Sequence, residues 1–265
     1  MKFPDIDPVW IHIGPLQLRW YGLMYVLAFV ASYFVITHQE KTRPIGLTPR
    51  LVQDFIFYIA IGLIVGARLG YVLFYQYMDL MEFVHHPLEI IAVWHGGMSF
   101  HGGLIGAAIA GWRFSKRHKI PFWALADRVI VAAPIGLGLG RIGNFINGEL
   151  FGRPSDLPWA MVFPGGGPLA RHPSQLYEAF LEGLVLFLVL LWLSRQKMPQ
   201  GVVLGTFLSG YGLFRFILEF FREPDPQLAF VLGPFTMGQV LCAVMMVIGT
   251  CMCLKATIRH RKMAR

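Results

Sequence analysis

The fold class is decided by one stretch of the sequence, which runs Leu181-Glu182-Gly183-Leu184-Val185-Leu186-Phe187-Leu188-Val189-Leu190-Leu191-Trp192-Leu193. Extended to residues 175–194, it reaches the roughly 20 mostly apolar residues that a helix needs to cross a bilayer. Its polarity does not alternate from residue to residue, as it would in a strand of a membrane β-barrel. The stretch therefore predicts a transmembrane helix.

The composition agrees with a chain surrounded mostly by lipid. Of its 265 residues, 55% are hydrophobic and only 14% are charged, whereas a soluble domain is roughly a quarter charged. The mean hydropathy is +0.56, which argues against a disordered chain, a disulfide scaffold and a water-soluble enzyme. The same length criterion selects six more segments, namely 18–37, 52–74, 93–112, 121–140, 201–221 and 234–254. We therefore predict an all-α polytopic membrane protein with seven transmembrane helices, forming one integral membrane domain over residues 1–265.

The net charge of +8 records topology rather than nucleic-acid binding, because the basic residues are divided among short loops and a tail. Most of them lie in the four segments 38–51, 113–120, 195–200 and 255–265. Since cytoplasmic loops carry an excess of Lys and Arg, these segments are predicted to be cytoplasmic. The N-terminus then lies outside, the C-terminus inside, and an irregular outer loop rich in glycine and proline covers about 141–174.

Ionisable residues at membrane depth indicate a polar interior, since such residues are costly in lipid. They are Arg68, His101, Asp127, Arg128, Glu178, Glu182, Arg215 and Glu219. Three polar residues, Tyr211, Arg215 and Glu219, recur at every fourth position and so share one face of the sixth helix. This stripe is either part of a site or an Arg–Glu pair that only joins two helices.

Two glycine-rich strings bring polar groups to the outer half of the membrane. The first reads Gly96-Gly97-Met98-Ser99-Phe100-His101-Gly102-Gly103-Leu104. Its glycines, including Gly102 and Gly103, allow close backbone approach or exposed amides near a bound anion. His101 is either a proton acceptor near neutral pH or a hydrogen-bonded histidine in a tightly packed helix.

The second string, residues 136–153, places Arg141, Asn144, Asn147 and Glu149 at the outer membrane surface. The planar guanidinium of arginine matches phosphate oxygens. Together with Arg215, this string predicts a site for an anionic phospholipid headgroup.

These residues resemble the prolipoprotein diacylglyceryl transferase family of bacterial inner membranes. The resemblance covers nearly the whole chain and is most specific at 140–149, which match Gly-Arg-x-Gly-Asn-Phe-x-Asn-Gly-Glu. It extends to Arg19-Trp20-Tyr21-Gly22-Leu23-Met24-Tyr25, to the string at 96–104, to Arg171-His172-Pro173-Ser174-Gln175-Leu176-Tyr177-Glu178 and to the stripe that starts at Tyr211.

The resemblance implies a multi-pass enzyme of the inner membrane with its active site toward the periplasm. It implies transfer of the sn-1,2-diacylglyceryl group of phosphatidylglycerol to the lipobox cysteine thiol of a prolipoprotein, with release of glycerol phosphate. This is the first step of lipoprotein maturation. The implied catalytic residues are His101, Arg141 and Arg215. The implied substrate-binding residues are Tyr21, Gly102, Gly103, Asn144, Glu149, Gly152, Tyr211 and Glu219.

The chemistry expected of these residues needs no metal and no cofactor, since the arginines can stabilise the leaving phosphate. The base is left open: either His101 takes the thiol proton, or the arginines lower the thiol pKa and His101 only positions the substrate. A lipid flippase is the main alternative function, because transporters also use broken helices and interior charges. The expected partners are phosphatidylglycerol, the prolipoprotein signal peptide and the lipid bilayer.

Overall fold

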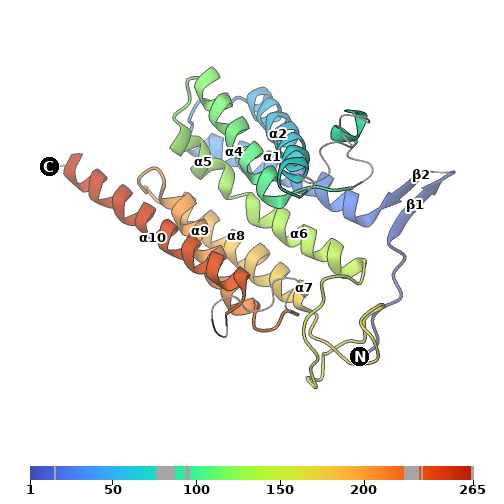
Figure 1. Cartoon of the computed structure of the whole chain (residues 1–265). Coiled ribbons are helices and arrows are strands. Elements are labelled where there is room, and N and C mark those ends of the chain that lie inside the picture. Colours follow the sequence, from blue (N-terminus) through green and yellow to red (C-terminus); the bar gives the residue numbers. More distant parts are fainter. Residues whose placement is uncertain (15, 76–86, 93–95, 224–232, 234, 264–265) are drawn as a thin grey trace. The chain divides into compact units, whose positions relative to one another are not determined.

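The computed structural model shows a mostly helical chain that begins with a small β-hairpin (Figure 1). It describes residues 1–14, 16–75, 87–92, 96–223, 233 and 235–263. The chain divides into two compact units, residues 37–126 and residues 1–36 together with 127–265.

The elements follow one another from the N-terminal hairpin to a long C-terminal helix. They are β1 (Val9–Ile13), β2 (Leu16–Arg19), α1 (Trp20–Thr42), α2 (Pro49–Tyr75), η2 (Pro87–Ile90), α4 (Phe100–Arg117), α5 (Phe122–Ile130), α6 (Ala133–Ile146), α7 (Ser174–Glu178), the π-helix η4 (Ala179–Val185), α8 (Leu186–Ser194), α9 (Val202–Leu218) and α10 (Met237–Met263).

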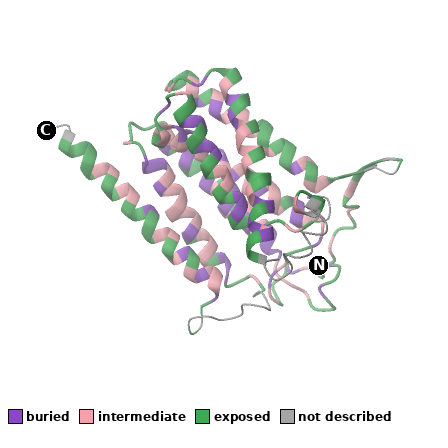
Figure 2. Cartoon of the chain, turned by 45° about the horizontal axis from the view of Figure 1, so that its top comes forward, coloured by how far each residue is buried: buried purple, intermediate pink, exposed green. Residues whose placement is uncertain are grey.

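Within the described residues, five helical stretches are long and apolar enough to cross a membrane. They are Trp20–Thr42, Pro49–Phe74, Phe122–Ile146, Ser174–Ser194 and Met237–Lys262. The apolar helix α9 is shorter, with 17 residues, or about 26 Å of helix. Figure 2 shows exposed residues along most of the C-terminal helix, as expected of a helix in lipid. The polytopic helical class is confirmed, and the count of seven spans stays a prediction.

Two predicted boundaries are wrong for local reasons. The helix expected at 93–112 begins only at Phe100, and residues 93–95 lie outside the described part of the chain. Gly96 and Gly97 have positive φ angles of 82° and 74°, and the Ser99 side chain caps α4 by accepting a hydrogen bond from the Gly102 N–H. Because Gly96 and Gly97 adopt left-handed backbone angles and Ser99 caps the first turn, the helix cannot extend to residues before Ser99.

The second boundary concerns the fourth predicted helix, which continues to Ile146 instead of ending near residue 140. The irregular loop that the sequence predicts from about residue 141 therefore starts after Ile146, and the polar residues at 141–146 lie on a helix. A regular backbone fixes their directions more firmly than a loop would.

The unit formed by residues 37–126 is built on the pair α2 and α4, whose glycines face one another. A Cβ on Gly102 would lie 2.9 Å from the Cα of Gly70, and one on Gly106 would lie 2.9 Å from the Cα of Gly66. Such small-residue contacts let membrane helices approach closely. Arg68 of α2 donates to the carbonyls of Ile90, Gly96 and Gly97, which holds the segment before α4 against α2.

The other unit contains two close helix contacts and an apolar core. Gly183 of η4 meets Gly138 of α6, where an added Cβ would lie 2.7 Å from the Gly138 Cα. The helices α9 and α10 lie side by side (Figure 1). The buried core consists of Val131, Leu186, Leu190, Leu193, Val202 and Val203. It extends along α8 and covers the start of α9, whereas Arg215 lies near the end of α9.

Asp127, one of the ionisable residues at membrane depth, has a structural role in this unit. Its carboxylate accepts hydrogen bonds from the backbone N–H groups of Gly201 (2.6 Å) and Leu204 (2.8 Å) at the start of α9. A carboxylate is stabilised there because the first N–H groups of a helix lack partners in the helix. Asp127 thereby anchors α9, the helix that carries the polar stripe.

Candidate active site

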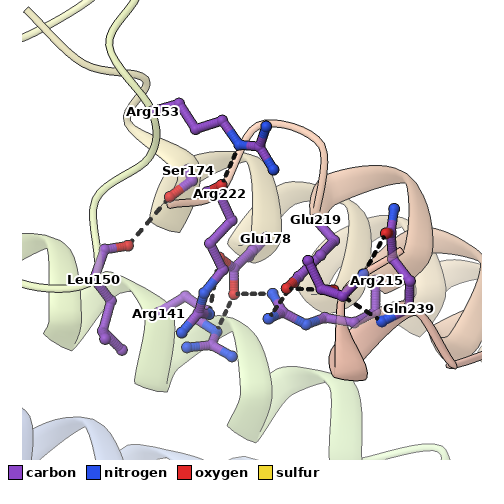
Figure 3. Close-up of polar contacts among 10 residues, drawn as sticks. Arg141, Leu150, Arg153, Ser174, Glu178, Arg215, Glu219, Arg222 and Gln239 are labelled. Atoms are coloured by element: carbon purple, nitrogen blue, oxygen red, sulfur yellow. Dashed lines mark hydrogen bonds and ion pairs between the residues drawn. The ribbon is translucent and has the colours of Figure 1, made fainter. Parts of the chain in front are cut away.

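The candidate site is organised around the buried carboxylate of Glu178, which three arginines approach (Figure 3). Glu178 is the last residue of α7, and its side chain is 1% exposed. Its Oε2 lies 2.7 Å from Nε of Arg141 and 3.3 Å from Nη1 of Arg215, and its Oε1 lies 3.6 Å from Nη1 of Arg222. One carboxylate thus joins α6, α7 and α9.

A second ion pair at the C-terminal end of α9 joins two residues of the polar stripe. Nη2 of Arg215 lies 2.8 Å from Oε2 of Glu219, one helical turn further along. Oε1 of Glu219 accepts a hydrogen bond of 3.1 Å from the Thr236 hydroxyl. Thr236 and Gln239 exchange side-chain and backbone hydrogen bonds at the start of α10, the pattern of a helix capping box. Arg215 is therefore held between carboxylates on two sides.

Tyr211, the third member of the stripe, has apolar neighbours in the structure. Its ring stacks on Phe207, with 5.8 Å between ring centroids, and it packs against the apolar core. It lies one turn before Arg215 on α9. The structure therefore places it beside the arginine cluster on the side of the core.

Arg141 and Asn144 lie on the last turns of α6, and Glu149 follows shortly after. Nη1 of Arg141 is 3.4 Å from Oδ1 of Asn144, whose Nδ2 donates to Oε1 of Glu149 at 2.9 Å. Tyr21 of α1 packs on the same helix, because a Cβ on Gly143 would lie 2.7 Å from its ring. The structure thus brings together all four residues that the sequence assigned to substrate binding or catalysis in this region.

Gly152 lies where two backbone segments leave no room for a side chain. Its N–H donates to the carbonyl of His172 at 2.9 Å, and a Cβ at this position would lie 2.8 Å from that of His172. The next residue, Arg153, donates a hydrogen bond from its backbone N–H to the carbonyl of Phe221 and one from its side-chain Nε to the carbonyl of Arg222. Partial burial lowers the pKa of His172. This close packing is sufficient to explain why residue 152 is a glycine. The hydrogen bonds of Arg153 connect the loop after α6 with the residues that follow α9.

His101, Gly102 and Gly103 belong to the unit of residues 37–126. His101 is the second residue of α4 and is exposed, with its ring edge-on to Phe100 at 5.8 Å between centroids. Gly102 and Gly103 are buried and face α2. Their helix contacts explain two glycines there, and the N–H of Gly102 is already bonded to Ser99.

Sequence reasoning did not assign Glu178, Glu182 and Arg222 to the site. Glu178 and Glu182 were recognised as ionisable residues at membrane depth, and that was the signal that could have found them. Glu182 is 0% exposed, and neither of its carboxylate oxygens has a hydrogen-bond partner among the described residues. Glu178 directly precedes the π-helix η4, and Glu182 lies within it. Such irregular turns are frequent at functional sites.

The arginines of the cluster stay partly exposed, so an anion can approach them, while the carboxyl groups of Glu178 and Glu182 are buried. Three guanidinium groups face the two carboxylates of Glu178 and Glu219. The side chains of Arg141, Arg215 and Arg222 remain 20%, 14% and 22% exposed, whereas Glu178 is 1% exposed. Burial, followed by the charge of Arg215, lowers the pKa of Arg222 against the opposing effect of Glu178. Each guanidinium has five N–H donors, so donors remain for phosphate oxygens.

Fold and site together define a polytopic helical membrane protein with an arginine-rich polar site among apolar helices. The family model described as prolipoprotein diacylglyceryl transferase matches residues 8–255. The chain belongs to this family. Three relatives are named phosphatidylglycerol–prolipoprotein diacylglyceryl transferase. Those from Geobacter sulfurreducens, Methylococcus capsulatus and Desulfotalea psychrophila are 56%, 52% and 49% identical, covering 95%, 94% and 93% of this chain and 96%, 95% and 92% of theirs.

Removal of the central carboxylate is expected to destabilise the protein strongly. Glu178→Gln keeps the side-chain volume but leaves three arginines without their shared counter-charge, and breaking a buried pair costs about 3–5 kcal/mol. The matched control is Glu223→Gln, which removes the ion pair of 2.9 Å between Arg171 and a carboxylate that is 46% exposed. An exposed pair contributes about 0–1 kcal/mol. We expect a clearly larger drop in melting temperature for Glu178→Gln in detergent micelles; equal drops would contradict a central role for Glu178.

Proposed function

We propose that this protein transfers the diacylglyceryl group of phosphatidylglycerol to the thiol of the lipobox cysteine of a prolipoprotein, in the bacterial inner membrane. The observation that carries the proposal is the cluster of Arg141, Arg215 and Arg222 around Glu178. The names of the relatives identify the same lipid and the same class of protein substrate. A cationic cluster beside apolar helices suits a molecule with a phosphate and two acyl chains.

In the proposed reaction, the cysteine thiolate attacks the C3 carbon of the diacylglyceryl group. A carbon–sulfur thioether bond forms while the bond from that carbon to the phosphate oxygen breaks, and glycerol phosphate leaves with the electron pair. Arg141 and Arg215 bind the phosphate and stabilise the charge that grows on it, an effect that is strong where water is excluded. Glu178 and Glu219 hold the guanidinium groups in place before the lipid arrives.

The thiol proton needs an acceptor, and we assign this role to His101. Its place at the exposed start of α4 leaves the imidazole accessible. Tyr21, Asn144 and Glu149 lie near the end of α6, which carries Arg141, and they are assigned to substrate binding, together with Tyr211 and Glu219. Gly102, Gly103 and Gly152 are assigned to the same task.

The proposed topology follows the distribution of basic residues, with seven spans, a periplasmic N-terminus and a cytoplasmic C-terminus. The candidate site then opens toward the periplasm, where the residues after Ile146 form the outer loop. The lipid would enter laterally between helices, because its acyl chains stay in hydrocarbon.

The function is tested with the purified protein in detergent micelles. The protein is incubated with phosphatidylglycerol labelled in its acyl chains and with a lipobox peptide. We expect label bound to the peptide through a thioether, with the mass of one added diacylglyceryl group, and none on a peptide in which serine replaces the cysteine. Absence of an adduct would overturn the proposal, and movement of lipid across vesicles without an adduct would support a flippase instead.

A further inference from the structure

The helices α2 and α4 form a groove, and of the residues assigned to the proposed reaction only Gly102 lines it. Its volume is about 650 Å³, and all residues that line it lie between Phe57 and Arg113. The cluster around Glu178 belongs to the other unit of the chain. The groove therefore needs its own explanation.

The groove has a backbone floor and apolar walls. Its floor consists of the facing glycines, such as Gly66 and Gly106, which carry no side chains and bring the two helix backbones into contact. One wall is a row of side chains at every fourth position of α2, and Ile105 and Ile109 of α4 stand opposite. The row consists of Phe57, Ile61, Val65, Leu69 and Leu73, each 46–65% exposed. Nothing in the described part of residues 37–126 covers this groove.

The length of the groove suits an extended hydrocarbon chain. The row of α2 side chains extends over about 24 Å at 1.5 Å per residue. One leaflet contributes about 15 Å to the hydrocarbon core of a bilayer, so an acyl chain of one leaflet fits within the groove. A glycine floor between two helices in backbone contact offers a width suited to methylene groups.

One end of the groove carries positive charge. Arg113 lines this end, is exposed, and makes no ion pair with the residues that the structure describes. Arg117 is one turn further and donates to the Tyr58 hydroxyl of the groove at 2.9 Å. Lys116 adds a third cation, and Asp54 is the acidic residue one turn before Tyr58 on α2. The excess is positive, and an anionic group would be favoured here.

The same charge argues against a signal-peptide helix as the occupant. The n-region of a signal peptide is positively charged and stays at the cytoplasmic surface, where the predicted topology also places Arg113. Two basic segments would meet at that end of the groove.

We propose that the groove binds one acyl chain of an anionic phospholipid of the cytoplasmic leaflet, with the lipid phosphate on Arg113. Binding of the phosphate at Arg113 requires no diacylglyceryl transfer. The bound chain covers the exposed glycine backbones of the α2–α4 contact.

The test compares two charge reversals on the same helix. Arg113→Glu and Lys116→Glu change the net charge equally at exposed positions of α4, but only Arg113 lines the groove. The full-length protein in delipidated micelles is titrated with dioleoyl phosphatidic acid, and bound lipids are counted by native mass spectrometry. We expect Arg113→Glu to weaken the binding of one lipid by about tenfold or more, as loss of a charge-assisted contact would, and Lys116→Glu to change it little.

Two further measurements complete the test. Ile109→Trp narrows the groove without altering charge and is expected to remove the same lipid, while dioleoyl phosphatidylcholine should bind weakly to all variants. Equal affinities in both charge variants, or an unchanged lipid count in Ile109→Trp, would overturn the proposal. If a signal peptide displaces the lipid and binds more tightly to Arg113→Glu than to the unaltered protein, the proposal is overturned and the groove binds a peptide instead. Diacylglyceryl transfer is measured in parallel, and the lipid count does not depend on it.

Discussion

Replacement of Arg215 by alanine is expected to lower the rate of diacylglyceryl transfer by about a hundredfold or more. Removing one preorganised donor to a developing negative charge typically costs about 2.7–4 kcal/mol. Arg215 is held by Glu178 at 3.3 Å and Glu219 at 2.8 Å, so it is oriented before the lipid binds. Arg141→Ala is expected to have an effect of the same size, because its Nε contacts the same carboxylate at 2.7 Å.

The measurement is the initial rate of thioether formation at saturating phosphatidylglycerol, with equal amounts of inserted and folded protein. Arg259→Ala, at an exposed position near the end of α10, removes one arginine far along the chain and should leave the rate unchanged. Arg215→Lys keeps the charge but loses the planar fork that matches phosphate, and it should recover only part of the rate. Near-normal turnover in Arg215→Ala or Arg141→Ala would reject a phosphate-binding role for that arginine.

The second large effect is expected for His101→Gln, in which transfer at pH 7 should fall to a small residual rate. If His101 accepts the thiol proton, the variant depends on thiolate that forms without a base. A free thiol has a pKa near 8.5, so roughly 3% is thiolate at pH 7 and roughly 75% at pH 9. The residual rate of the variant should therefore rise by about twenty-five-fold over this interval, while the unaltered protein changes much less.

The control for the pH series is His38→Gln, at an exposed position of α1, which should follow the unaltered protein at every pH. A loss in His101→Gln that is the same at all pH values would contradict the role as base. In that case the thiolate would be generated by the positive charge of the arginines, and His101 would act only through substrate positioning.

The sequence was sufficient to predict most of the membrane-spanning helices, because hydropathy over about 20 residues depends on no tertiary contact. Residues 175–194, predicted from one apolar run, agree closely with the helical stretch Ser174–Ser194. The helix expected at 93–112 was wrong at its start, since the φ angles of Gly96 and Gly97 and the cap at Ser99 depend on local backbone geometry. The extension of α6 to Ile146 was missed because glycine and polar residues suggested a loop.

The candidate site was predicted in part for a similar reason. Regular spacing was enough to pair Arg215 with Glu219, because residues four apart share a helix face. The partner that Arg141 and Arg215 share was not predicted, since Glu178 lies far from both in the sequence and only the packing of α6, α7 and α9 brings them together. Membrane depth marked Glu178 as unusual, but no local pattern indicated which charges it would meet.

The π-helix η4 explains why the two halves of the helical stretch Ser174–Ser194 face different neighbours. A π-helical turn behaves as an α-helix with one residue inserted, and one residue corresponds to a rotation of about 100° around the helix axis. Glu178 before the turn is directed at the arginines, while Leu186 and Leu190 after it enter the apolar core. A deletion within Ala179–Val185 would restore a regular helix and turn one of these faces toward lipid. The extra residue thus allows one transmembrane segment to contact the arginine cluster before the turn and the apolar core after it.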